Sequence, residues 1–76
     1  MSVRIVITPH FSELYGVRES ALPAPLSGES VREYIVRAGL GKEEDILPVV
    51  GGRAKSFDYR FEENDEVTIY PMAASG

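Results

Sequence analysis

The ten residues SVREYIVRAG, at positions 30–39, carry the clearest structural signal in this sequence. Ser30 and Glu33 have the spacing of a capping box, in which the serine hydroxyl accepts from the Glu33 amide and the glutamate reaches back to the Ser30 amide. Gly39 or Gly41 supplies a left-handed end cap. The apolar positions recur at the spacing of one helical stripe: Val31, Tyr34, Ile35 and Ala38. The stretch predicts a helix with a single apolar face.

Two stretches before this helix predict strands. Residues 3–8 have apolar side chains at alternate positions, which is typical of a strand with one buried face, and Pro9 ends the pattern. The connection over residues 10–16 has the spacing for a single helical turn. Residues 17–22 form a weaker second strand pattern before two prolines.

A hairpin follows the helix. Residues 46–50 are apolar and predict a strand, in which Pro48 indicates an edge position or a start after the proline. Gly51 and Gly52 then predict a two-residue type I′ turn, because both central positions of that turn need positive φ. A short return strand over residues 53–56 completes the hairpin.

The last strand follows a second turn. Asn64 is one of the few non-glycine residues that tolerate the left-handed conformation, so it predicts this turn. Val67 and Ile69 then alternate with Thr68 and Tyr70. Because side chains alternate across a strand, the first pair is expected to face the core and the second pair the other side of the sheet.

The order of these elements predicts one α+β domain. One helix cannot cover both faces of a sheet, so the economical arrangement is a helix packed across one face of a mixed, four- to five-stranded sheet. Residues 1–71 are expected to form this domain, and residues 72–76, which are small and have no core-forming pattern, a flexible C-terminal tail.

Composition excludes several classes of function. The 76 residues include no cysteine, which removes disulfides, thiolate metal sites and a cysteine nucleophile. Twelve acidic residues against eight basic ones give a net charge of −4, which disfavours nucleic acid as a partner. No apolar run is long enough to span a membrane, so a cytoplasmic protein is expected. The acidic runs at residues 43–45 and 62–63 are interpreted as solvated loops, and no metal site is expected.

Over nearly the whole chain the sequence resembles the MoaD/ThiS family of ubiquitin-like sulfur carriers. The resemblance rests on Gly51-Gly52 followed by Arg53, on the stretch ENDEVTIYP at residues 63–71, and on the small-residue tail that ends in Gly76. The order of elements and the length match as well. The segment around residues 57–59 also resembles the ubiquitin-like domains attached to Mut7-C nucleases, a related branch. The resemblance implies the ubiquitin-like β-grasp fold.

The resemblance also implies a function at the C-terminus. In that family an adenylyltransferase similar to ubiquitin-activating enzymes uses ATP to adenylate the terminal carboxylate, here that of Gly76. A sulfur donor then converts the adenylate to a thiocarboxylate, and a synthase accepts the sulfur in molybdopterin, thiamine or related biosynthesis. The chain would be a protein co-substrate and not an enzyme, with no cofactor of its own.

The tail residues fit this function in part. Ala73, Ala74 and Ser75 add little bulk, so they are expected to thread into a partner's active site ahead of Gly76, whose missing Cβ lets the backbone approach closely. Ser75 stands where the family has a penultimate glycine. The alternative is therefore a β-grasp protein-binding module that has lost carrier activity.

A docking face is predicted on the sheet. If the strand over residues 3–8 pairs with the last strand, Val6 lies beside Thr68 and Tyr70 on the face away from the helix. These three residues lead toward the tail, so they are the candidate contact surface for the activating partner.

Overall fold

The computed structural model describes residues 2–72 of the chain. Within these residues there are four strands, two α-helices and two short 3₁₀ helices. In chain order the elements are β1 (Arg4–Ile7), α1 (Pro9–Tyr15), η1 (Glu19–Ala21), α2 (Val31–Ala38), η2 (Glu43–Asp45), β2 (Ile46–Val50), β3 (Arg53–Ala54) and β4 (Glu66–Pro71).

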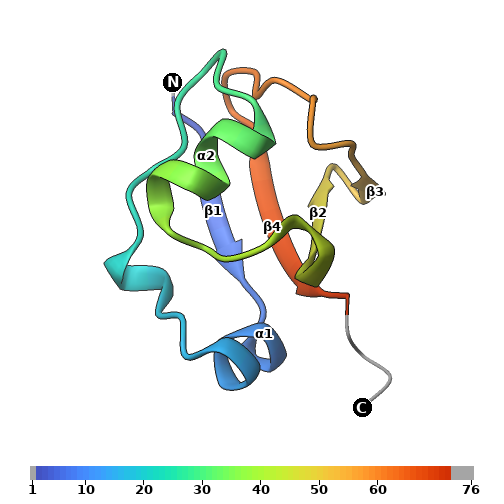
Figure 1. Ribbon diagram of the computed structural model, residues 1–76. Helices are drawn as coiled ribbons and strands as arrows, with labels where there is room; N and C mark the ends of the chain where they lie inside the picture. The colour runs from blue at the N-terminus through green and yellow to red at the C-terminus, as the bar shows by residue number, and fades with distance from the viewer. Residues whose placement is uncertain (1, 73–76) are drawn as a thin grey trace.

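The four strands form one mixed sheet in the order β1-β4-β2-β3. β1 runs parallel to β4, and β2 runs antiparallel to both of its neighbours, β4 and β3. Figure 1 shows α2 lying across one face of the sheet, with α1 beyond the end of β1. The predicted α+β architecture, a helix packed across a mixed four-stranded sheet, is confirmed.

The helix α2 forms as its sequence predicts. The Ser30 hydroxyl accepts from the Glu33 amide at 3.0 Å, and the Glu33 carboxylate accepts from the Ser30 amide at 3.0 Å, which completes the capping box. Gly39 ends the helix with φ of 68° and ψ of 35°, and its amide bonds back to the last turn. Both ends of α2 are therefore capped by hydrogen bonds from neighbouring residues.

The core lies between α2 and the sheet. Tyr34 and Ile35 from α2 meet Val67 and Ile69 from β4, and all four side chains are at most 3% exposed. Phe61 packs its ring edge-on against Tyr34, with the ring centroids 6.2 Å apart. The remaining buried apolar residues are Val3, Ile7, Phe11, Val31, Leu40, Ile46 and Val50.

The single helical turn predicted after β1 is a full short helix, α1. Thr8 caps it, since its hydroxyl accepts from the Phe11 amide at 3.2 Å, and Pro9 occupies the first helical position, where a missing amide hydrogen costs nothing. Gly16 closes the helix in the left-handed conformation. Phe11 is fully buried, so α1 closes one end of the core.

The predicted strand over residues 17–22 is wrong, because that segment contains η1 and no strand. Val17 and Leu22 are five residues apart, so a strand would place them on opposite faces. With the turn of η1 between them, both pack against the core. Glu19 then lies beside β1, where its Oε1 accepts from the Ile7 amide at 2.9 Å. A single side chain thus occupies part of the edge at which a second strand was expected.

Pro48 lies inside β2, which begins at Ile46, and β2 lies between β4 and β3. On the β3 side, however, Pro48 lies beyond the end of the paired strand, because β3 pairs only with Val49 and Val50. The Pro48 carbonyl accepts from the Lys55 amide at 2.9 Å on that side. The amide and carbonyl of one strand residue point the same way, so the proline nitrogen also faces away from β4. It therefore removes no bond from the ladder between β2 and β4.

The two predicted turns have the positive φ angles that the sequence predicts. Gly51 and Gly52 have φ of 60° and 80°, which gives the type I′ hairpin between β2 and β3. Asn64 has φ of 72° and is the only non-glycine residue among those described with positive φ. The return strand is shorter than predicted, since β3 covers only Arg53–Ala54.

Candidate functional site

The face of the sheet away from α2 carries the three residues predicted to dock a partner. The register places Val6 of β1 opposite Thr68 of β4. Val67 and Ile69 point into the core and are each 1% exposed, so their neighbours Thr68 and Tyr70 point to the other face. The structure brings Val6, Thr68 and Tyr70 onto one surface, and Tyr70 is 42% exposed.

Two further apolar residues belong to this surface and were missed at the sequence level. Leu47 pairs with Tyr70 and Val49 pairs with Thr68 across the ladder between β2 and β4. Both alternate with the buried residues of β2, which is the signal that could have found them. It was obscured because all five residues of the strand are apolar. We call this surface the open face: Val6, Leu47, Val49, Thr68 and Tyr70.

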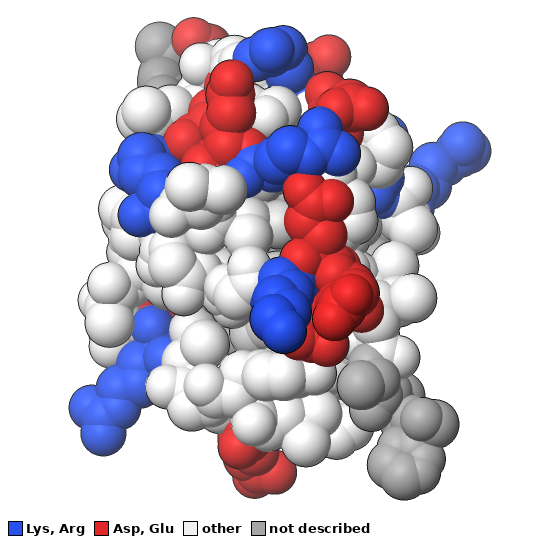
Figure 2. Space-filling view, viewed as in Figure 1, with Lys and Arg blue, Asp and Glu red and all other residues white. Residues whose placement is uncertain are grey.

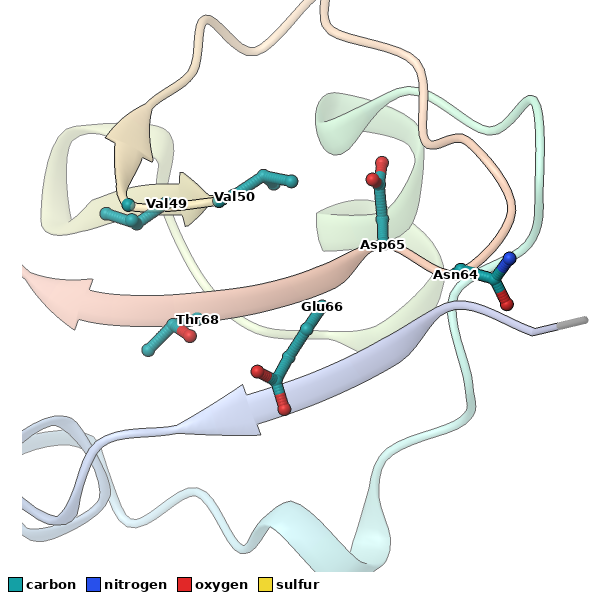
Figure 3. A pocket seen from close by; sticks show the side chains of 8 residues that line it. Val49, Val50, Asn64, Asp65, Glu66 and Thr68 are labelled. Carbon is teal, nitrogen blue, oxygen red and sulfur yellow. The ribbon is translucent and has the colours of Figure 1, made fainter.

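The open face ends in polar groups at the start of β4. Arg4 and Glu66 form an ion pair at 3.6 Å, and their side chains are 74% and 52% exposed, so the pair adds little stability. Figure 3 shows Glu66 and Thr68 on one side of β4 and Asp65 on the other. Beside them lies a hollow of about 340 Å³, lined by Val49, Val50, Gly51, Gly52, Asn64, Asp65, Glu66 and Thr68.

The other end of the open face leads toward the C-terminus. Tyr70 is followed by Pro71 and Met72, and Met72 is 52% exposed. The predicted tail residues Ala73, Ala74, Ser75 and Gly76 lie outside the described residues. The candidate docking residue Tyr70 is thus two positions from the last described residue of the chain.

The opposite face of the molecule, on the side of α2, carries charged side chains. Figure 2, viewed from the side of α2, shows acidic and basic side chains interleaved over this face. Arg32 bridges Glu43 and Asp58, and Arg60 lies 3.5 Å from Glu33. The hydrogen bonds that Arg32 donates to both carboxylates raise its pKa, with the bond to Asp58 the stronger effect. Several charges of this face are thus paired with one another, while the open face groups the apolar side chains of Val6, Leu47, Val49 and Tyr70.

One ion pair on the helix side is held in bidentate geometry. Arg37 donates from Nε to Glu29 Oε2 at 2.8 Å and from a terminal nitrogen to Glu29 Oε1 at 2.9 Å. The same guanidinium donates to the Ala24 carbonyl at 2.9 Å. The hydrogen bonds from Arg37 are the main reason that the pKa of Glu29 is lowered. This pair ties the segment before α2 to the last turn of the helix.

Within residues 2–72 the acidic side chains and His10 do not gather into any group of three that could hold a metal ion. In the same residues no helix is long and apolar enough to cross a membrane.

Comparisons with known proteins give a fold and no family. No family model matches the sequence. No curated protein matches it either. Among solved structures, the crystal structure of SAMP1 from Haloferax volcanii superposes with a TM-score of 0.62 and 14% sequence identity over 100% of both chains. The match covers the whole chain, so the protein has the ubiquitin-like β-grasp fold.

Proposed function

We propose that this protein is a ubiquitin-like carrier of the MoaD/ThiS type, whose Gly76 carboxylate is adenylated by a partner enzyme and converted to a thiocarboxylate. The β-grasp fold and its whole-chain match to SAMP1 support a ubiquitin-like modifier or carrier in general. The sulfur chemistry rests on the resemblance of residues 51–76 to the sulfur carriers.

The observation that carries the proposal is the position of the open face. Its apolar residues lie on the side that α2 leaves uncovered, and β4 runs through the middle of it. A partner that covers Tyr70 therefore lies beside the point where β4 leads into the C-terminal residues. Apolar burial would supply the affinity, and the face ends beside Met72, from which four further residues lead in sequence to Gly76.

The chemistry explains why the protein needs a partner. A carboxylate is a poor electrophile until one oxygen becomes part of a good leaving group. In the partner's site the Gly76 oxygen attacks the α-phosphorus of ATP, and pyrophosphate leaves. Hydrosulfide then attacks the carbonyl carbon of the adenylate, and AMP leaves with the oxygen. No residue among those described is needed as acid, base or nucleophile in these steps.

Ser75 supports a second candidate function. A Cβ and a hydroxyl next to the reacting residue could obstruct a channel shaped for two glycines. In this alternative the chain is a β-grasp binding module that uses the open face and no longer carries sulfur.

Intact mass separates the two candidates. The purified protein is incubated with ATP, sulfide and an extract of the cells from which its gene comes, and its intact mass is then measured by mass spectrometry. A carrier gains the mass difference of one oxygen replaced by sulfur, and a variant lacking Gly76 does not. The Ser75→Gly variant is the matched control, because it restores the two-glycine end without touching the folded domain. Conversion of that variant while the natural chain stays unchanged would identify a binding module.

A further inference from the structure

Among residues 2–72, no strand covers the outer edge of β1. This strand is the first in the sheet order, so β4 is its only neighbour in this part of the chain. The Arg4 amide donates to the Asp65 carbonyl at 2.9 Å and the Thr8 amide to the Ile69 carbonyl at 3.2 Å, both on the β4 side. Since backbone groups alternate along a strand, the amides and carbonyls of the odd-numbered residues of β1 point outward.

The outward groups are only partly used. The Ile7 amide donates to Glu19 Oε1, as described above. Within residues 2–72 no hydrogen bond reaches the amide or the carbonyl of Val3 or Ile5. Val3 is only 2% exposed overall but lines the hollow beside this edge, so its backbone groups have no partner within residues 2–72 and little contact with water. Unpaired buried backbone groups of this kind are uncommon and indicate a place where a partner is expected.

A hollow of about 590 Å³ lies along this unused edge. One wall is the edge itself, residues 2–5, and the other is formed by η1 and the residues that follow it, up to residue 24. The second wall includes Leu22 and Ala24, which are apolar, and Glu19 stands at the end where the Ile7 amide is already bound. We call this hollow the β1 slot: Ser2, Val3, Arg4, Ile5, Glu19, Ser20, Leu22 and Ala24.

We propose that the β1 slot accepts an extended segment of a partner protein as an additional edge strand. The segment exchanges backbone hydrogen bonds with Ile5 and Val3, as in other cases of strand addition to a sheet edge. Its apolar side chains pack against Leu22 and Ala24. A Lys or Arg at the end beside Ile7 meets the Glu19 carboxylate, which charge complementarity favours in a protein of net charge −4.

The shape of the slot decides between a peptide and a second copy of the chain. The slot has walls on both sides, and the second wall is residues 19–24 of the same molecule. A second copy would bring its own residues 19–24 to the same edge, and the two segments would collide before the β1 strands could pair. A single extended chain has no such obstruction. This proposal concerns an edge of the sheet and not the open face, so it holds or fails independently of the proposed function.

The test uses a blocked hexapeptide of sequence lysine-valine-threonine-valine-threonine-valine as the probe, titrated into ¹⁵N-labelled protein. The expected result is a shift of the Val3 and Ile5 amide signals, with slower exchange of those amide hydrogens. Two N-methylated versions of the probe provide the decisive comparison, each methylated at alternate residues. One set of methyl groups faces β1 and the other faces away from it, toward residues 19–24, where no backbone bond is proposed, so only the version methylated toward β1 is expected to lose about tenfold or more in affinity.

Three outcomes would overturn the proposal. Equal binding of the two methylated probes would mean that side chains alone make the contact. Shifts centred on Thr68 and Tyr70 would place the probe on the open face. Self-association of the protein with protection of Val3 and Ile5 would assign the slot to a second copy. Two variants of the protein complete the test. Glu19→Ala is expected to abolish the preference for a probe that begins with lysine over one that begins with threonine. Glu13→Ala, which changes an exposed glutamate elsewhere, is the control and is expected to retain that preference.

Discussion

Two tyrosine hydroxyls are held by the fold in their neutral form. Tyr34 donates to the Pro23 carbonyl at 2.7 Å, and burial raises its pKa to about 12. Tyr59 donates to Asp65 Oδ2 at 2.7 Å, and that hydrogen bond, followed by burial, raises its pKa to about 12 as well. Tyr34 ties α2 to Pro23, eleven residues earlier in the chain, and Tyr59 fixes the turn, six residues on, that leads into β4.

These raised values predict a loss of stability in alkali. Both phenols have a pKa near 10 when the chain is unfolded and about 12 when it is folded. The folded state therefore keeps protons that the unfolded state releases, and the stabilising contribution is complete below pH 10 and disappears as the pH rises toward 12. The free energy of unfolding, measured by urea titration, is expected to fall over that interval.

The Tyr59→Phe variant checks the residue behind this effect. It removes one phenol that titrates at about 12 and leaves Asp65 with only the Glu62 amide as donor to Oδ2. Loss of the bond is expected to cost about 1 kcal/mol at neutral pH. Absorbance of the phenolate would then show a single late-titrating tyrosine. Two late transitions in this variant would contradict the assignment.

At the scale of elements, the helix α2 depends on its cap. The Ser30→Ala substitution removes the acceptor for the Glu33 amide and is expected to cost about 1 kcal/mol of unfolding free energy. Ser27→Ala, three residues earlier and exposed, is the matched control and is expected to change stability by less than about 0.5 kcal/mol. Equal effects of the two substitutions in thermal unfolding would show that the capping box does not stabilise the helix.

The elements that the sequence predicts correctly are those whose signals are local. The cap and stripe of α2, the paired glycines of the hairpin and the left-handed Asn64 each depend on a few neighbouring residues. The strand predicted at residues 17–22 failed because a strand forms only where another strand pairs with it, and Glu19 meets β1 with its side chain. The hydrophobic pattern of residues 17–22 does not show whether another strand is available to pair with them.

The same distinction holds for the candidate site. The alternation of β4 predicted the direction of Thr68 and Tyr70, but the contribution of Leu47 and Val49 depends on the register between β2 and β4, which is a long-range property. The β1 slot was beyond prediction, because it exists only where the expected second strand is missing. Ser75 and Gly76 remain assigned by resemblance alone, since they lie outside the described residues.

For the whole molecule, the contrast between its two faces predicts where partners bind. The helix side carries the ion pairs of Arg32 and Arg37, whereas the open face groups Leu47, Val49 and Tyr70, so under the proposed function the activating enzyme is expected to contact the open face. Tyr70→Glu places a charge in that contact without disturbing the core, because Tyr70 is 42% exposed. Thiocarboxylate formation in extract is expected to fall by about tenfold or more, with an unchanged free energy of unfolding.

Val36→Glu is the matched control for this prediction. Val36 lies on the outer side of α2, on the charged face, and is 77% exposed. The substitution adds the same charge far from the open face, so conversion is expected to stay within about twofold of the natural protein. If Tyr70→Glu and Val36→Glu behave alike, the open face is not the docking surface.

The place of β4 in the sheet has a consequence for synthesis of the protein. β4 is one of the two inner strands and pairs with both β1 and β2, yet it is the last element described along the chain. During translation β1 leaves the ribosome early and has no partner until residue 71 has emerged. If the chain is fused to an arrest peptide and the length of the translated part is varied, a folding force is therefore expected only when residues up to 71 have left the ribosome. Chains terminated earlier lack β4 and stay open to proteases, so resistance to proteolysis is expected only for chains translated past residue 71.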